Sequence, residues 1–384
     1  MDYNNSPIDF SAYKPAGYPV RHKRKIPFDP TLRAHPNYRE IVQKIRDLDN
    51  GLGEMVLSGD DYLNLVNEAY ASNIHWSVKI EGNDLPLEEV HRLTTLFTSK
   101  KDKKETASGP QQEILNHLYS FVVKNKFSLP WSPEMVKDVH SMLLMDTGAE
   151  CLIGKFRTEP ASIIGADGFE YFIACPPGSI DEEMDSLLEW LAGSPYDEIV
   201  TAALFFHEFE SIHPFQDGNG RTGRTLFHIL LQELGLKNSK LCKFEQKLLD
   251  PPTTYYTLLA YTDSMGNYGP FIMYVASSLL SAYEEAFAAF EEKDLIKDLD
   301  ESSKTIVKRA KKQGRFTVSD ACKWVPGLGE QSIRKKLNDL VKIKLLEKVG
   351  NTRSMIFVFR DPFRDFLEVK SVPMENQIIG KRSA

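Results

Sequence analysis

The chain has 384 residues, which is enough for two or three domains and at least one sizeable hydrophobic core. Charged residues make up 26% of it and the formal net charge is -7, so we expect a soluble globular protein with no general attraction to nucleic acid or anionic membranes. The four cysteines are widely spaced and form no CxxC pair, so neither a zinc knuckle nor a disulfide framework is expected. No run of about 18 apolar residues occurs, and the simplest expectation is a cytoplasmic protein.

The first part of the chain, to about residue 50, is rich in proline and charge and is expected to form a solvated arm that leads into a helix. A second helix is predicted from residue 60, because apolar side chains recur there at helical spacing: Leu63, Val66, Tyr70 and Ile74. Gly82 fits the position just past the end of this helix. Another helix starts near Pro86, and residues 99–110 are expected to be an exposed connection.

The central region is predicted to be helical with one β element. The helical segments are 111–124, 132–145, 181–192, 197–212, about 222–234, and 252–292. Residues 162–164 and 169–173 form a predicted β-hairpin around an Asp167-Gly168 turn.

The last part of the chain differs in composition. Helices are predicted over 302–313, 318–324 and 330–340, followed by strands over 345–349 and 355–359, an order typical of a winged helix. Six positive residues fall within 304–315, and three more, Arg334, Lys335 and Lys336, lie on the expected recognition helix. This pattern is compatible with DNA binding, although neighbouring acids dilute the charge and leave protein docking or dimerisation as the favoured alternative.

The stretch HPFQDGNGRTGR, residues 213–224, carries the strongest functional signal. Gly218, Gly220 and Gly223 spell the dinucleotide fingerprint GxGxxG, but the preceding segment has a helical apolar face where that fingerprint needs a strand. A zinc protease motif is excluded because Ser211 stands where a second histidine is required, and no P-loop pattern occurs.

What remains is a helix, a glycine-rich loop and another helix, which is a typical anion site. Gly218-Asn219-Gly220 lets backbone amides approach a phosphate closely. Arg221 and Arg224 fall in the first turn of the following helix, where the helix dipole disfavours cations, so their presence suggests a bound polyanion.

Two further residues complete a constellation for group transfer. Asp217 lies beside the loop, and one carboxylate next to a polyphosphate is the usual protein ligand for Mg²⁺. His213 can act as general base for an attacking hydroxyl, a role worth about 10²- to 10⁴-fold in rate. The set indicates nucleotidyl or phosphoryl transfer from a nucleotide.

These residues resemble the Fic family motif HxFx(D/E)GNGRxxR at every specified position. The resemblance implies a mainly α fold, in which an all-helical Fic core carries a β-hairpin flap. It also implies an activity: the core uses ATP and Mg²⁺ to transfer AMP to a Ser, Thr or Tyr hydroxyl of a protein, including itself. It implies His213 as the catalytic base and Asp217 as the metal ligand. The nucleotide-binding residues that it implies are Gly218, Asn219, Gly220, Arg221, Gly223 and Arg224, the last of them at the γ-phosphate.

The resemblance extends to the hairpin, which looks like the family's flap and would pair with the target segment as an added strand. Ile163 and Ile164 are candidates for clamping the target side chain, with plain hairpin packing as the alternative. Tyr255-Tyr256 resembles the aromatic pair on the adenine side of the pocket, and Tyr256 is the candidate contact.

A second stretch, SVKIEGN from Ser77 to Asn83, resembles the family's inhibitory motif (S/T)xxxE(G/N). In the family this glutamate, here Glu81, pairs with the second arginine, here Arg224, in place of the γ-phosphate. The resemblance therefore implies self-inhibition, with removal of AMP from a modified protein as an alternative use of the same site.

The expected domains are an N-terminal helical region carrying the inhibitory helix (1–110), a Fic catalytic core (111–296) and a winged-helix domain with a tail (297–384). A protein substrate is the implied partner, and a homodimer is compatible with the family. A DNA-binding regulator that uses the Fic core as a sensor is the alternative from a different functional class.

Overall fold

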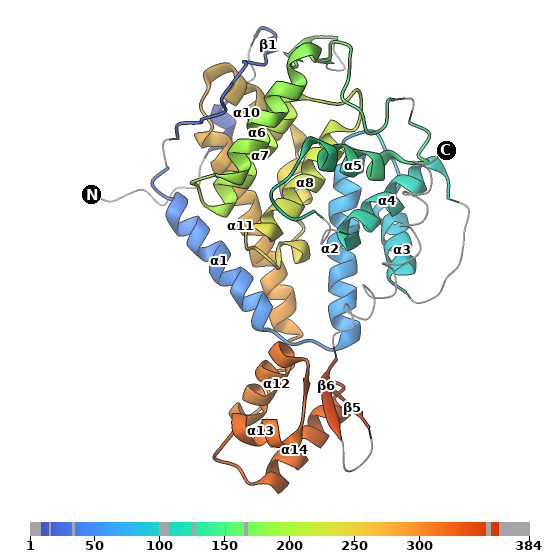
Figure 1. The fold of residues 1–384 in the computed structure, drawn as a ribbon, viewed down its shortest axis with the longest axis vertical. Helices are drawn as coiled ribbons and strands as arrows, with labels where there is room; N and C mark the ends of the chain where they lie inside the picture. The colour runs from blue at the N-terminus through green and yellow to red at the C-terminus, as the bar shows by residue number, and fades with distance from the viewer. Residues whose placement is uncertain are drawn as a thin grey trace. The chain divides into compact units, whose positions relative to one another are not determined.

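The computed structural model describes residues 9–14, 17–32, 35–99, 107–123, 127–149, 151–164, 168–350 and 355–360. These residues are mostly helical, as the sequence predicts, and their strands form two three-stranded sheets (Figure 1). The chain forms two compact units, residues 1–49 with 69–284 and residues 50–68 with 285–384.

The longer helices that lie wholly or partly in the first unit agree closely with the segments predicted from apolar spacing. They are α1 (Tyr38–Glu54), α2 (Gly59–Lys79), α3 (Leu87–Thr98), α4 (Gly109–Val123), α5 (Pro133–Leu144), α6 (Ile180–Ala192), α7 (Glu198–Ile212), α8 (Asn219–Glu233), α10 (Pro252–Met265) and α11 (Gly269–Glu292). A short helix that was not predicted, α9 (Phe244–Leu249), precedes α10.

The paired helices α7 and α8 form the centre of the first unit and lie side by side in Figure 1. Helix α7 is buried on all sides rather than on one face, and almost every residue of it is buried. Close packing of the two helices depends on Gly223, because a Cβ there would lie 2.3 Å from Glu210 Oε1 and 2.9 Å from Phe209 Cδ1. Glycine at this position is therefore explained by helix packing.

The predicted hairpin is present as β2 (Ser162–Ile164) and β3 (Glu170–Ile173), which pair antiparallel. Residues 165–167 of its turn, including Asp167, lie outside the described residues, whereas Gly168 has a left-handed backbone (φ 77°). A two-residue strand that was not predicted, β1 (Val20–Arg21), pairs parallel with β3, so the sheet order is β1-β3-β2. The N-terminal arm is thereby fastened to the hairpin.

Two predicted helix boundaries are wrong. Helix α8 begins at Asn219 rather than near Thr222, because Gly218 takes a left-handed conformation (φ 78°) and ends the loop one turn earlier. The predicted helix over 252–292 is two helices, since Gly266 caps α10 with φ 65°.

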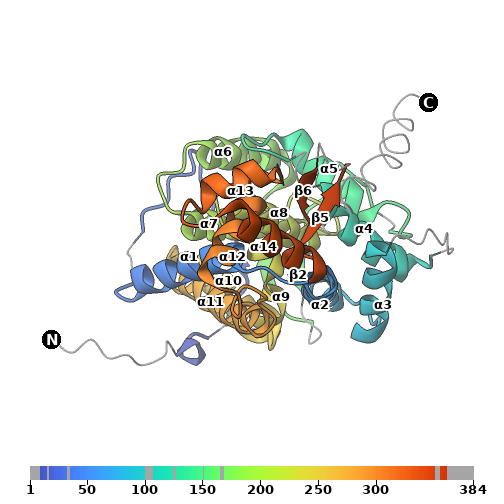
Figure 2. The ribbon, with the colours of Figure 1, turned by 90° about the horizontal axis from the view of Figure 1, so that it is seen from below.

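The second unit contains α12 (Glu301–Gln313), α13 (Val318–Trp324) and α14 (Glu330–Lys342), which pack on a sheet of order β4-β6-β5 (Figure 2). Its strands are β4 (Arg315–Phe316), β5 (Leu346–Val349) and β6 (Ile356–Phe359). Only β4 was not predicted. The order of elements agrees with the sequence pattern, and assignment as a winged helix stays a prediction.

No helix within the described residues is both long and apolar enough to span a lipid bilayer.

Candidate active site

The turn between α7 and α8 carries His213, which caps the end of α7 in a left-handed conformation (φ 52°, ψ 59°). Its Nδ1 lies 3.3 Å from the carbonyl oxygen of Glu210. A carbonyl can only accept, so Nδ1 carries the proton and donates it, and in the neutral ring Nε2 then presents a lone pair. The backbone thus selects the tautomer that a general base requires.

Burial lowers the pKa of His213 to about 4, with a smaller opposing effect from its hydrogen bond to the Glu210 carbonyl. The ring is therefore neutral at pH 7. Arg157 fixes the backbone of the same turn: its Nε donates to the His213 carbonyl at 2.7 Å, and its own backbone N–H donates to Pro214 O at 2.9 Å.

The loop that follows is braced by two side chains. The Asn219 amide accepts the Phe215 N–H and donates to the Phe215 carbonyl, both at 2.8 Å. His140 Nδ1 accepts the Gly154 N–H at 3.0 Å, which leaves Nε2 protonated to donate to the Asp217 carbonyl at 2.9 Å. The Asn219 side chain is thus committed to holding the loop, and its backbone amide is what remains for a phosphate.

The start of α8 is arranged to receive an anion. Gly218 at the N-cap provides no side-chain hydrogen bond to the first turn. The first backbone amides of a helix have no partner within it and carry the positive end of the helix dipole. These amides begin at Asn219, where the sequence predicts an anion site.

Arg221 is held on one side of this site between two carboxylates. It lies 2.5 Å from Glu113 Oε1 and 2.8 Å from Asp217 Oδ1. Glu113 also accepts a hydrogen bond from Asn83 at 2.7 Å, which links α4 to the turn after α2. The Asp217 side chain remains half-exposed.

Arg224 is held by the end of α2. Its Nε donates to Ser77 Oγ at 2.9 Å, and its second amino group donates to the Ser77 carbonyl at 2.9 Å and to Glu81 Oε1 at 2.7 Å. The Arg224 side chain is 3% exposed and that of Glu81 is 26% exposed. The structure therefore contains the ion pair that the family resemblance implies.

Gly220 allows this pair to reach the first turn of α8. A Cβ at Gly220 would lie 2.3 Å from Glu81 Oε1 and 2.7 Å from Arg224 Nη1. The carboxylate of Glu81 consequently lies directly over the turn in which the anion site begins. Arg221 and Arg224, although three residues apart, have different partners.

A cavity of about 440 Å³ opens between the hairpin and α10. Three residues singled out from the sequence line it, namely Ile163, Ile164 and Tyr256, together with Glu210 from α7. Tyr255 does not line the cavity; it is buried and stacks on Phe206 in the core.

Glu210 has an unusual environment. Its Oε1 is buried without a hydrogen-bond partner among the described residues. Burial raises the pKa of Glu210 to about 8. The nearby Arg224 lowers this pKa by a smaller amount, and the negative charge of Glu81 raises it further. The carboxyl is therefore mainly neutral at pH 7.

Sequence reasoning missed four residues of the site: Glu113, His140, Arg157 and Glu210. None of them lies in a recognisable local pattern, and each is brought to the loop by tertiary packing. Glu210 had a weak signal, since a carboxylate three residues before a candidate base on a mainly apolar helix is unusual.

Comparison with known proteins identifies this region. Residues 130–231, which run from just before α5 into α8, match the model of the Fic/DOC family. A Fic family protein from Desulfovibrio desulfuricans G20 has a similar fold, with a TM-score of 0.59 and 21% identity, over 87% of this chain and 98% of that protein.

Two curated relatives are named as protein adenylyltransferases. Protein adenylyltransferase fic-1 of Caenorhabditis briggsae is 23% identical over 245 residues, which are 62% of this chain and 45% of that protein. A probable protein adenylyltransferase of Aquifex aeolicus is 37% identical over 84 residues, which are 22% of this chain and 25% of that protein. The chain thus spans half or less of the length of these two relatives.

Proposed function

We propose that this protein is a nucleotidyltransferase that moves AMP from ATP to a Ser, Thr or Tyr hydroxyl of a protein. The observation that carries the proposal is the His213 imidazole, neutral and with Nε2 available, beside the amides that open α8. The names of the relatives support the same activity.

In this proposal His213 takes the proton of the target hydroxyl while the hydroxyl oxygen attacks the α-phosphorus of ATP. The bond between the α- and β-phosphates breaks and pyrophosphate leaves. The α8 amides and Arg221 hold the phosphates, and Tyr256 contacts the adenine in the cavity. Each of these groups belongs to a rigid element or a braced loop, which favours precise positioning.

Mg²⁺ would be held by Asp217 together with the nucleotide phosphates, where it offsets their charge. The half-exposed carboxylate of Asp217, next to the helix start, fits that role. Ion pairing to Arg221 orients this carboxylate before any metal arrives.

The hairpin supports a protein rather than a small-molecule acceptor. Its strand β2 lies at the edge of the sheet and pairs only with β3 among the described strands, so an extended peptide can add to it as a further strand. Ile163 and Ile164 lie on that strand, at the rim of the cavity, and would contact the target side chain.

The Glu81–Arg224 pair supports self-inhibition. Arg224 is the cation expected to bind the γ-phosphate, and its hydrogen-bonding groups are already directed to Ser77 and Glu81. A γ-phosphate would reach the buried Arg224 guanidinium only by displacing Glu81, and this competition would keep ATP out of its productive pose most of the time. Removal of AMP by the same site, with Glu81 orienting a water, is the alternative direction.

The function of the second unit as a DNA-binding module is less well supported. Several of its cations are paired with acids of the same unit, including Lys336 with Asp300 at 2.7 Å and Arg334 with Glu330 at 2.7 Å. Protein docking or dimerisation is the favoured role.

Incubation with ATP labelled at the α- or γ-phosphate tests the proposal. We expect label on protein from α-labelled ATP only, and its loss in His213→Ala with nucleotide binding retained. Transfer of the γ-label would instead indicate a kinase, and transfer that survives His213→Ala would show that His213 is not the base.

A further inference from the structure

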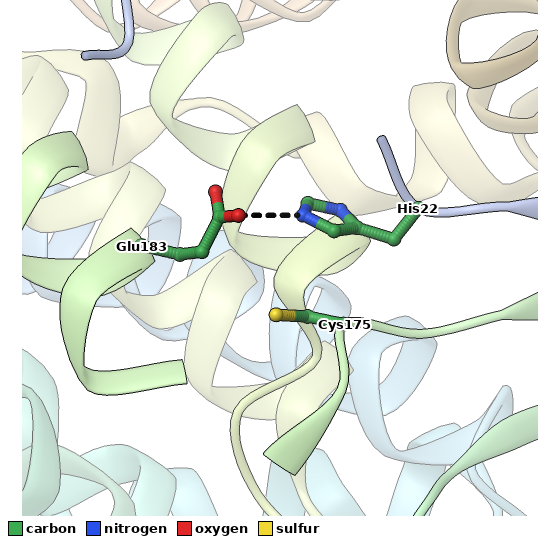
Figure 3. A group of neighbouring side chains, drawn as sticks. All are labelled: His22, Cys175 and Glu183. Carbon is green, nitrogen blue, oxygen red and sulfur yellow. Dashed lines mark ion pairs between the residues drawn. The ribbon is translucent and has the colours of Figure 1, made fainter. Parts of the chain in front are cut away.

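Outside the Fic motif, three buried side chains from separate elements converge on one point. His22 follows β1, Cys175 follows β3, and Glu183 lies on α6 (Figure 3). One ligand atom from each lies within 4.8 Å of the others. Within the described ranges, this is the only group of three His, Cys, Asp or Glu side chains with such spacing.

The strand pairing brings two of these residues together. Strands β1 and β3 run parallel, and the pairing continues past β1 because the His22 N–H donates to the Ile173 carbonyl at 2.8 Å. Cys175 follows two residues after Ile173, on the same side of the sheet end as His22. The arrangement is therefore built by the fold and does not depend on mobile surface groups.

Hydrogen bonding fixes the orientation of the His22 ring. Ser211 Oγ donates its single proton to Asp263 Oδ1 at 2.7 Å. It must therefore accept from His22 Nδ1, which lies 2.9 Å away. The ring nitrogen that remains, Nε2, points at Glu183 Oε1 across 3.6 Å, as Figure 3 shows.

Neither atom of that facing pair is satisfied. His22 Nε2 and Glu183 Oε1 are both buried and have no hydrogen-bond partner among the described residues, and 3.6 Å is too long for a hydrogen bond between them. The side chains are 1% and 3% exposed. Two lone pairs facing each other away from water require a cation between them, either a shared proton or a metal ion.

Neighbouring groups offset the negative charge of the Glu183 carboxylate only in part. Its other oxygen accepts the Lys25 backbone N–H at 3.3 Å. Arg24 Nε lies 3.9 Å from Glu183 Oε1, but Arg24 is exposed and pairs with Glu182. A dehydrated carboxylate with such partial compensation is costly, so an additional positive charge would be stabilising.

The chemical nature of the three ligand atoms, one nitrogen, one sulfur and one oxygen, decides which cation fits between them. Zinc binds nitrogen, sulfur and oxygen ligands at about 2.0 to 2.3 Å, so neighbouring ligand atoms of a tetrahedral site lie roughly 3.4 Å apart. The distance of 3.6 Å between His22 Nε2 and Glu183 Oε1 is close to that edge. Mg²⁺ and Ca²⁺ prefer oxygen ligands alone and do not suit a thiol.

We propose that His22, Cys175 and Glu183 form a zinc site, separate from the Mg²⁺ position at Asp217. The Ser211–Asp263 pair orients the histidine ligand through its other ring nitrogen, as outer groups do in zinc sites. On binding, Cys175 Sγ loses its proton to solvent and forms a bond to the metal, so one proton is released per ion.

The thiol at this point is protonated before metal arrives, because burial raises the pKa of Cys175 to about 11. Coordination would displace that proton. The ion would join the arm, the hairpin and α6. Arg157 extends the connection to the active site, because it donates to the Cys175 carbonyl as well as to the His213 carbonyl.

Metal content of the full-length protein tests this site. Protein expressed with zinc and dialysed against buffer should carry one zinc per chain, and Cys175→Ser and His22→Gln should lose it. Cys322→Ser, which removes a half-buried cysteine of the other unit, is the matched control and should keep it. Wild-type protein without zinc above background would overturn the proposal and leave a protonated His22–Glu183 pair.

Cobalt replacement gives an independent readout that does not depend on activity. Metal-free wild-type protein titrated with Co²⁺ should develop a thiolate-to-cobalt absorption band, and Zn²⁺ should remove it by competition. The melting temperature of the wild type should also rise with added zinc. Absence of both the band and the rise in wild-type protein would contradict the site even if the variants failed to fold.

Discussion

Arg224 donates hydrogen bonds to both Ser77 and Glu81, so one guanidinium on α8 is held by the last turn of α2 and by the turn after it. The contact combines an ion pair with capping of a helix C-terminus, because the Ser77 carbonyl belongs to the last turn of α2. Regulation would then depend on which anion this guanidinium holds.

Glu81→Gly should raise AMP incorporation, including self-modification, by well over tenfold, because it frees Arg224 for the γ-phosphate. Incorporation of α-labelled ATP measures the effect. Glu88→Gly, which removes an exposed acid from α3, is the control and should leave the rate near that of the wild type. An unchanged rate in Glu81→Gly would remove the inhibitory role from this residue.

Ser77→Ala should activate the enzyme partially. The change leaves the buried Nε of Arg224 without its acceptor, which costs about 1 to 3 kcal/mol, while Glu81 still competes for the side chain. We expect a rate between those of the wild type and Glu81→Gly, together with a lower melting temperature. Ser77→Thr keeps the hydroxyl and should resemble the wild type. Activation equal to that of Glu81→Gly would mean that Ser77, rather than Glu81, dominates the contact.

The acid limb of the pH–rate profile should lie near pH 4. Burial holds the pKa of His213 at about 4, below the ordinary value of 6.5, so the base stays neutral across the physiological range. The unfolded chain binds the proton more readily, so the stability contributed by this group falls as pH decreases from 6.5 through 4. A kcat/KM profile of Glu81→Gly would measure the limb. An acid limb near 6.5 would show an imidazole exposed to water.

Glu210→Gln should be nearly neutral at pH 4.5 and below, and increasingly stabilising as the pH rises from 4.5 to about 8. Burial raises the pKa of Glu210 to about 8 from 4.5, so the folded protein holds an extra proton in that window and loses stability as pH rises through it. Arg224, Glu81, Tyr255 and Tyr256 surround the group. Melting temperatures at pH 4.5 and 8.5 measure the difference, and equal pH dependence in both proteins would contradict a neutral Glu210.

Gly223→Ala should lower stability by about 1 to 3 kcal/mol, since its Cβ would overlap Glu210 and Phe209. Gly178→Ala is the control, because no atom lies within 4 Å of the added Cβ. Denaturant unfolding compares the two. Equal stabilities would mean that α7 and α8 can separate without cost.

Local patterns predicted most of the fold because apolar spacing and helix caps are encoded within a few residues. They failed where a glycine conformation decided the outcome: Gly218 starts α8 early and Gly266 divides α10 from α11. Strand β1 was missed because two residues give no alternation, and its pairing with β3 is set by tertiary contact.

The candidate site was predicted from one motif and one weaker resemblance. The pairing of Glu81 with Arg224 spans 143 positions in the chain and came from the resemblance, not from spacing. Glu113 and His140 could not be found in this way, since a single carboxylate or imidazole on an ordinary helix has no local signature. The cysteines gave no metal pattern either, because the ligands of the proposed zinc site are distant in sequence.

The left-handed backbone at His213 has a consequence for how this position can evolve. For a residue with a side chain, the left-handed conformation costs roughly 1 to 2 kcal/mol of free energy, whereas for glycine the cost is almost zero. Selection for stability alone would therefore favour glycine where selection for chemistry retains an imidazole. A lineage that lost the reaction should be free to gain stability at this single codon.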